Sequence, residues 1–132
     1  MDLAKHDMNA LGNQGAWISI VGPDGRPTDL RIKIRGAQSD PLRKVQEDHK
    51  QRVAAAIKAA KGDKVDFEAL DKVRDREMAI ASTIDWENFE ENGQPLACTP
   101  EAVARYYLHP GYDWLVVQVY AGAQDAKVFL TP

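Results

Sequence analysis

The segment Leu30–Arg35 alternates apolar and basic residues with a period of two. Successive side chains of a β-strand point to opposite faces, so this pattern predicts a half-buried strand with its leucine and isoleucines inward. The run Ala16–Val21 is also rich in strand-forming residues, and Gly22–Gly25 between the two runs has proline and glycine at turn positions. We therefore expect a β-hairpin over residues 15–36. Because an isolated hairpin is marginal in water, its apolar face must pack, or its edge must pair with another chain.

A helical pair is predicted over residues 41–84. Asp40 followed by Pro41 has the form of an N-cap and a first helical residue, and Gly62 closes a helix that spans about 41–61. Asp66 is the predicted N-cap of a second helix over about 66–84. The first helix has a thin, alanine-rich apolar stripe. The expected buried face of the second consists of Phe67, Leu70, Val73, Ile80 or Ala81, and Ile84.

An acidic connector, residues 85–98, separates this pair from a predicted C-terminal helical cap over residues 99–132. Within the connector, Asn92–Gly93 is a strong turn signal. Thr99 before Pro100 predicts the start of a helix. Residues 113–122 have strong β propensity and a continuous apolar run, so periodicity leaves helix and strand both open; we favour a helix. Phe129 and Leu130 are expected to fold back onto the body.

One domain is expected, because 132 residues can bury a core without disulfides. Residues 1–14 are polar and predict a flexible N-terminal arm. The predicted fold class is α+β, with an N-terminal β-hairpin followed by a mainly helical body of about four helices. The start of the chain lacks the apolar and basic regions of a signal peptide, and its longest apolar run is too short for a membrane span. We expect a soluble, cytoplasmic protein that does not insert into membranes.

Charge is divided unevenly along the chain. Residues 26–61 carry ten basic and four acidic residues, whereas residues 62–132 carry six basic and thirteen acidic residues. This asymmetry is compatible with self-association of the basic and acidic halves, with a charged protein partner, or with the solvated faces of two helices. The basic segment has no aromatic residue between Arg26 and Lys61, so it offers no stacking platform, and nucleic acid is not an expected partner.

No catalytic, cofactor-binding or metal-binding residues are predicted. The chain has no nucleophile-elbow motif, no glycine-rich phosphate loop and no zinc-protease motif. Its histidines occur in unrelated contexts, and His49 lies on the apolar stripe of a helix, where a packed histidine is favoured over a ligand. The single cysteine, Cys98, is interpreted as a small buried hydrophobe rather than a nucleophile. The acids of residues 85–91 lack the ligand spacing of a calcium loop.

The order of these pieces resembles the small tail assembly chaperones of tailed bacteriophages and prophages. The resemblance covers nearly the whole chain, and its pieces, each weak alone, are Trp17–Ile20, Gly22–Gly25, Leu30–Gly36 with Ser39–Asp40, Ile84–Phe89, Asn92–Leu96, Thr99–Val103 and Phe129–Leu130. It implies an α+β protein without enzymatic activity that acts in the host cytoplasm. It also implies a partner, the tape-measure protein or other tail proteins, which the chaperone keeps soluble during tail morphogenesis. The family supplies no binding residues to transfer.

Trp86 and Phe89 are the residues that we expect to form or flank a partner-binding surface, because a chaperone for a long helical client needs apolar contact area rather than a reactive group. The alternative is that both anchor the core. Two other functional classes stay open: a structural minor tail or head-tail protein that is retained in the virion, and a small-ligand binding domain. Self-association through the N-terminal hairpin is a further expectation, since its edge can pair with another chain.

Overall fold

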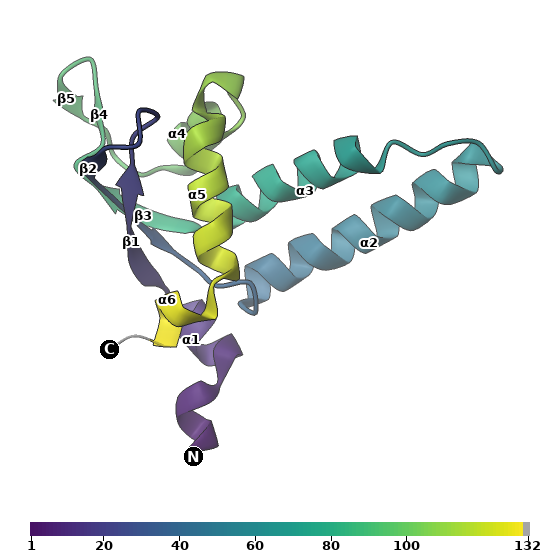
Figure 1. Ribbon diagram of the computed structural model, residues 1–132, viewed down its shortest axis with the longest axis horizontal. Helices are drawn as coiled ribbons and strands as arrows, with labels where there is room; N and C mark the ends of the chain where they lie inside the picture. The colour runs from purple at the N-terminus through teal and green to yellow at the C-terminus, as the bar shows by residue number, and fades with distance from the viewer. Residues whose placement is uncertain (131–132) are drawn as a thin grey trace.

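The computed structural model describes residues 1–130, whose fold is α+β (Figure 1). The elements before the long helices are η1 (Leu3–His6), α1 (Met8–Gln14), β1 (Ala16–Val21) and β2 (Pro27–Ile34). The middle of the chain contains α2 (Asp40–Ala60), α3 (Phe67–Ser82), β3 (Thr83–Glu87), β4 (Glu90–Glu91) and β5 (Gln94–Pro95). The C-terminal elements are α4 (Pro100–Tyr107), η2 (Pro110–Tyr112), α5 (Asp113–Gln124) and α6 (Ala126–Leu130).

The main sheet is antiparallel and has the order β1-β2-β3. Its central strand, β2, places Ile32 opposite Ile18 on one side and opposite Trp86 on the other. In the turn between β1 and β2, the N–H of Gly25 donates to the carbonyl of Gly22 over 3.0 Å. The strands β4 and β5 form a separate two-stranded ribbon. Its turn is Asn92–Gly93, both with positive φ, as its Asn-Gly sequence favours.

The predicted architecture of an N-terminal hairpin followed by about four helices is wrong. Six α-helices are present among residues 1–130, and the first of them precedes the hairpin. The hairpin itself is two thirds of a three-stranded sheet, because Thr83–Glu87 pairs with β2 as a third strand. That strand was divided between a predicted helix and a predicted connector. The alternation of Ile84 and Trp86 with polar residues is a strand pattern, but only five residues long.

The segment predicted as a flexible arm contains α1, which is tied to the start of α2. Asp7 is the N-cap of α1, and its carboxylate accepts hydrogen bonds from the N–H groups of Asn9 and Ala10. The Asn9 amide donates to the carbonyl of Gln38 over 2.8 Å. Gly12 is buried, and a Cβ atom on it would lie 3.2 Å from the backbone nitrogen of Ser39. The polar N-terminal residues therefore make tertiary contacts, which polarity alone does not reveal.

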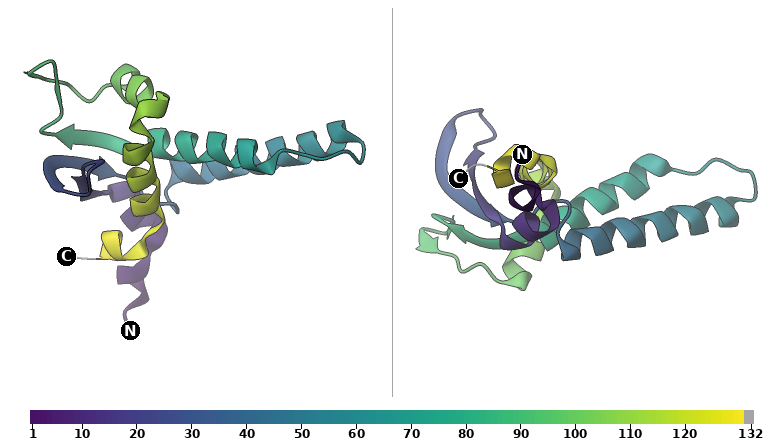
Figure 2. Two further views of the ribbon diagram at one scale, coloured as in Figure 1. Left: turned by 45° about the horizontal axis from the view of Figure 1, so that its top comes forward. Right: turned by 90° about the horizontal axis from the view of Figure 1, so that it is seen from below.

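The core lies between the sheet and the C-terminal helices. Ile20, Ile32 and Ile34 from the sheet are fully buried together with Leu115 and Val119 from α5. The helix predicted over 113–122 is confirmed as α5, which crosses the sheet in the views of Figures 1 and 2. The packing is tight at Gly122, where a Cβ atom would lie 3.0 Å from the Cδ1 atom of Ile34. Close packing onto the sheet is thus what fixes a segment whose β propensity is high.

Helices α2 and α3 form a long pair that projects away from the sheet (Figures 1 and 2). We call residues 40–82 the helical projection. No residue from Arg43 to Glu77 is buried. Phe67 and Val73, predicted on the buried face of α3, are 48% and 44% exposed, and the buried residues of α3 are Met78, Ala79 and Ser82 at its inner end. The predicted face was wrong because only this inner end reaches the core.

The helical projection is cross-linked by polar contacts between its two helices. Arg52 of α2 pairs with Glu77 of α3 over 3.0 Å, and His49 Nε2 lies 3.4 Å from an Asp71 carboxylate oxygen. On the sheet, Arg31 pairs with Glu87 over 2.6 Å. Each of these contacts joins the basic segment to the acidic segment. Part of the charge asymmetry is therefore satisfied within one chain.

Candidate partner-binding surfaces

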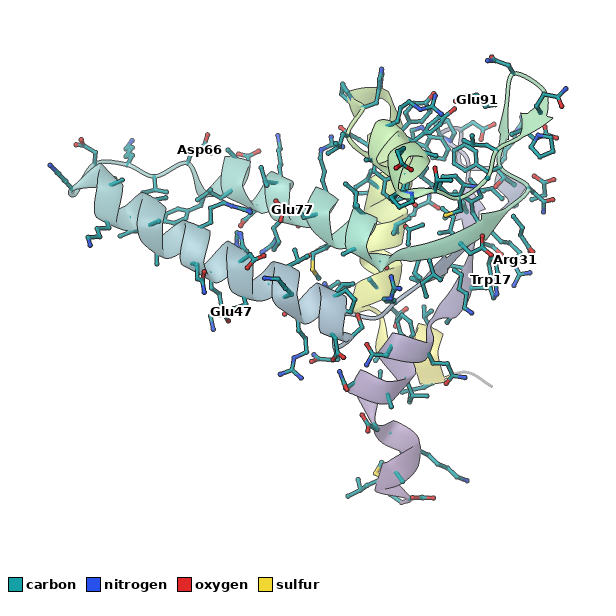
Figure 3. The ribbon with its side chains drawn as sticks, turned by 180° about the vertical axis from the view of Figure 1, so that it is seen from behind. Trp17, Arg31, Glu47, Asp66, Glu77 and Glu91 are labelled. Carbon is teal, nitrogen blue, oxygen red and sulfur yellow. The ribbon has the colours of Figure 1, made fainter. Side chains whose placement is uncertain are left out.

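An aromatic cleft lies where the β3–β4 region meets α4, η2 and α5. Its volume is about 410 Å³, and its apolar lining is formed by Leu30, Phe89, Tyr106, Tyr112, Trp114 and Leu115. Asn88, Glu90, Glu91 and Asn92 complete the lining. The cleft is at the opposite end of the molecule from the tip of the helical projection, as the positions of Glu91 and Asp66 show in Figure 3. It is therefore a distinct surface.

The two residues expected to contact a partner have different positions. Trp86 is only 6% exposed and belongs to the core, and its indole N–H donates to the carbonyl of Leu96 over 2.7 Å. Phe89 is half-buried and stacks on Trp86 with ring centroids 4.3 Å apart. Phe89 lines the cleft, whereas Trp86 lies behind it. Phe89 is therefore accessible to a partner, and Trp86 supports it.

The rings of Phe89, Tyr106 and Tyr112 form a continuous series along the cleft. The ring centroids of Phe89 and Tyr106 lie 4.8 Å apart, and those of Tyr106 and Tyr112 also lie 4.8 Å apart, both pairs in an edge-to-face arrangement. Edge-to-face contacts at these separations are favourable for aromatic pairs. Tyr112 and Trp114 were not predicted as site residues. The available signal was the density of aromatic residues between 106 and 114, combined with the helix start at Thr99, whose hydroxyl accepts from the N–H of Ala102 as predicted.

Glu91 organises the polar side of the cleft. Its carboxylate accepts hydrogen bonds from the Tyr106 hydroxyl at 2.5 Å and from Arg105 at 2.7 Å. These bonds lower the pKa of Glu91, the tyrosine hydroxyl being the larger cause. The same bond raises the pKa of Tyr106 to about 12, so the phenol stays protonated near neutral pH. The Arg105 guanidinium also lies 5.1 Å from the centroid of the Tyr106 ring.

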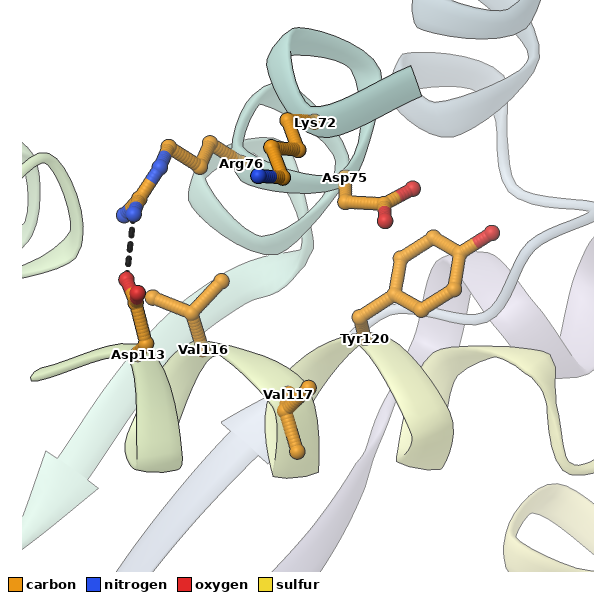
Figure 4. Close-up of a pocket in the computed structure, with 7 residues that line it drawn as sticks. All are labelled: Lys72, Asp75, Arg76, Asp113, Val116, Val117 and Tyr120. Atoms are coloured by element: carbon orange, nitrogen blue, oxygen red, sulfur yellow. Dashed lines mark hydrogen bonds and ion pairs between the residues drawn. The ribbon is translucent and has the colours of Figure 1, made fainter. Parts of the chain in front are cut away.

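A second concave surface is the groove between α3 and α5, with a volume of about 260 Å³. Its lining residues are Lys72, Asp75, Arg76, Asp113, Val116, Val117 and Tyr120 (Figure 4). Arg76 pairs with the Asp113 carboxylate and donates to the carbonyl of Tyr107, which joins the helical projection to the body. Val117 is 65% exposed beside this pair. The groove thus offers apolar contact area at the inner end of α3.

The tip of the helical projection carries a third apolar surface. Ile57, Val65 and Phe67 line a shallow hollow around the loop that joins α2 to α3. Ile57 is 52% exposed, and Phe67 is nearly as exposed. The loop ends at Asp66, whose carboxylate accepts from the N–H of Ala69 and so caps α3 as predicted. Large apolar side chains are therefore held in water at the end of an ordered pair of helices.

Cys98 and His49 are both held in packed surroundings. Burial, with a smaller contribution from Asp85, raises the pKa of the Cys98 thiol to about 11, which keeps it protonated at neutral pH. His49 packs between the two long helices beside Asp71, as the sequence analysis favoured. Within residues 1–130 there is no group of three or more histidine, cysteine, aspartate or glutamate side chains that could hold a metal ion. No helix in that range is long and apolar enough to cross a membrane.

Comparison of the chain with family models, with curated proteins and with solved structures gave no match.

Proposed function

We propose that this protein is a non-enzymatic tail assembly chaperone of a bacteriophage or prophage, which binds the tape-measure protein in the host cytoplasm and keeps it soluble during tail morphogenesis. The resemblance in the order of the sequence motifs supplies the identity of the client. The helical projection supports a binding role: it presents two long helices on which no residue between 43 and 77 is buried. A helical client can pack against such a surface by inserting its side chains between those of α2 and α3.

The proposed contact points are exposed apolar residues at the tip of the projection and in the α3–α5 groove. Ile57 and Phe67 at the tip and Val117 beside the α3–α5 groove are large apolar side chains in water. Covering them with the apolar face of a client helix removes that area from water, at about 25 cal/mol per Å². A tape-measure protein is long and helical, so it can present such faces repeatedly. This arrangement would shield the client from aggregation until its tube subunits polymerise.

The test is co-expression with the client, taken as the long helix-rich protein encoded beside this chain. The wild-type chain should keep that protein soluble and should co-purify with it. The double variant Ile57→Ser, Phe67→Ser should lose both activities while keeping its helical content, because both side chains are exposed. Ala59→Ser, Ala69→Ser is the matched control on the same helices, and both of its positions are exposed. Equal client solubility with and without the chain would refute the proposal.

Whether the protein is retained in the virion distinguishes the chaperone role from the alternative structural role. A chaperone should be missing from purified virions, whereas a structural minor tail or head-tail protein would be present in them at a fixed copy number. Mass spectrometry of purified particles makes this distinction. Self-association through the edge of the β-hairpin or through the basic and acidic halves stays a prediction. Light scattering of the pure chain at low and high salt checks it, because charge-driven association weakens as salt rises.

A further inference from the structure

The lining of the aromatic cleft combines rings with carboxylates, whatever the identity of the client. We propose that this cleft binds a lysine or arginine side chain of a protein partner. Four aromatic rings line it, those of Phe89, Tyr106, Tyr112 and Trp114. The faces of such rings are electron-rich and attract ammonium and guanidinium groups within about 6 Å of the ring centroid. A cleft with several such rings is the kind of pocket in which organic cations are recognised.

The charge of the lining selects a cation over an anion. Two carboxylates, Glu90 and Glu91, lie among the rings, and the cleft contains no lysine or arginine lining residue. Glu91 is already paired with Arg105. Glu90 is exposed, and its carboxylate makes no hydrogen bond or ion pair with any residue among 1–130. Glu90 is therefore the charge that an incoming cation can pair with.

The chain already contains this interaction at the rim of the cleft. Arg105 lies over the Tyr106 ring and pairs with the Glu91 carboxylate, so one cation is held by one ring and one acid. Phe89, Tyr112 and Trp114 with Glu90 provide the same combination for a second cation. Trp114 is available for it, because its ring makes no aromatic contact and its indole N–H makes no hydrogen bond with the described residues. Tryptophan is the ring that binds cations best.

The same features argue against other occupants. An acidic peptide would bring its carboxylates against Glu90 and Glu91, which is unfavourable. A purely apolar side chain would desolvate Glu90 without pairing it, and an unpaired charge is costly to bury. A long basic side chain suits both the rings and the carboxylate. Its methylene groups contact the rings while its charged end reaches the carboxylate. The partner segment is therefore basic.

Hexalysine is the probe, with fully Nζ-acetylated hexalysine as its neutral counterpart. Proton–nitrogen NMR spectra of the wild-type chain follow the indole resonance of Trp114, assigned with the Trp114→Phe variant, and the backbone amide of Glu90. Hexalysine should shift both resonances saturably, and the acetylated peptide should leave them unchanged. Equal shifts with the two peptides would mean an apolar groove and would overturn the proposal. Failure of hexalysine to shift either resonance at millimolar concentration would overturn it too.

Two variants with a matched control locate the binding. Glu90→Gln and Trp114→Leu should each weaken hexalysine binding about two- to fivefold, the change expected for an exposed cation–ring or ion-pair contact. Glu47→Gln on α2 removes the same charge at an exposed position far from the cleft (Figure 3), and it should leave binding unchanged. If Glu47→Gln weakens binding as much as Glu90→Gln, the affinity for hexalysine depends on the net charge of the protein, and the cleft is not the binding site. Loss of client solubility in the projection variant with hexalysine binding intact would separate the two proposals.

Discussion

The side chain of Asn13 caps a helix that begins 27 residues later: its Oδ1 atom accepts a hydrogen bond from the backbone N–H of Asp40 at 2.9 Å. Ser39, and not Asp40 as predicted, is in the N-cap position of α2, and its side chain makes no capping bond. The hydroxyl of Ser39 is buried and has no partner among the described residues. The exposed N–H at the start of the helical projection is therefore capped from α1 and not by the side chain of the preceding residue.

Asn13→Ala should destabilise the chain, because it leaves the N–H of Asp40 without its acceptor. Loss of a cap costs about 1 kcal/mol, with a range of about 0.5–2 kcal/mol. Urea unfolding, followed by circular dichroism at 222 nm, measures the change in the free energy of unfolding. Ser39→Ala should be neutral or stabilising by up to about 1 kcal/mol, because it removes a buried hydroxyl that has no partner. Destabilisation by Ser39→Ala larger than that by Asn13→Ala would contradict this assignment of the cap.

Among the glycines, Gly15 is the one least able to accept a side chain. It has φ +84°, and a Cβ atom would lie 2.7 Å from Cδ1 of Ile84 and 2.9 Å from the carbonyl oxygen of Ile34. We expect Gly15→Ala to cost about 3 kcal/mol or more, from backbone strain together with the clash. Gly25→Ala is the comparison, because its φ is +81° but no atom lies within 4 Å of the added carbon. It should cost only about 1–2 kcal/mol, the backbone contribution. Thermal unfolding of both variants tests the difference.

Local signals in the sequence predicted the elements that are determined locally. The capping carboxylate of Asp66, the capping hydroxyl of Thr99 and the turn at Asn92–Gly93 are where their residue types place them. Each of these features depends on a few neighbouring residues. Local signals do not determine α5, because its sequence alone favours strand and helix alike. Its packing against Ile18 and Ile34 through Gly122 is a tertiary contact.

The missed features depend on distant residues. α1 forms tertiary hydrogen bonds from Asn9 and Asn13 to residues near the start of α2, and a polar sequence does not show them. β3 exists because β2 offers a free edge to Thr83–Glu87. In the aromatic cleft, Phe89 and Glu91 lie next to the turn that the sequence analysis singled out. Tyr112 and Trp114 join them through the fold of the C-terminal helices, so only part of the cleft could be predicted.

Substitutions of Trp86 and Phe89 should have different effects on the free energy of unfolding and on client binding. Trp86→Ala removes a buried ring and the hydrogen bond to Leu96, and it should cost about 3–5 kcal/mol of unfolding free energy. Phe89→Ala should cost less, since its ring is half-buried. Client pull-down at a temperature where both variants are folded then measures binding. If both folded variants still bind the client as the wild-type chain does, these residues are core anchors and do not contact the partner.

Cys98 should react slowly with alkylating reagents. Its pKa of about 11, compared with an ordinary value of 9.0, leaves little thiolate at pH 8, and the thiolate is the reactive form. The rate with iodoacetamide should therefore be about a hundredfold lower than that of an unperturbed thiol and should rise about tenfold per pH unit up to the pKa. Unfolding in urea should restore the ordinary rate. A folded chain that reacts as fast as the unfolded chain would contradict the burial of this thiol.

The hydrogen bond between Tyr106 and Glu91 should be detectable as a lowered pKa of the Glu91 carboxyl group. Because folding lowers the pKa of Glu91 below its ordinary value of 4.5, its contribution to stability is present above that value and is lost as the pH falls through the lower, folded pKa. Tyr106→Phe removes the largest cause of the shift, so the pKa of Glu91 should rise. Carbon NMR of the glutamate carboxyl groups measures it directly. Tyr112→Phe is the control, because Tyr112 lines the same cleft without bonding to Glu91, and the pKa of Glu91 should stay low in that variant. An unchanged pKa in Tyr106→Phe would mean that Arg105 alone holds the carboxylate.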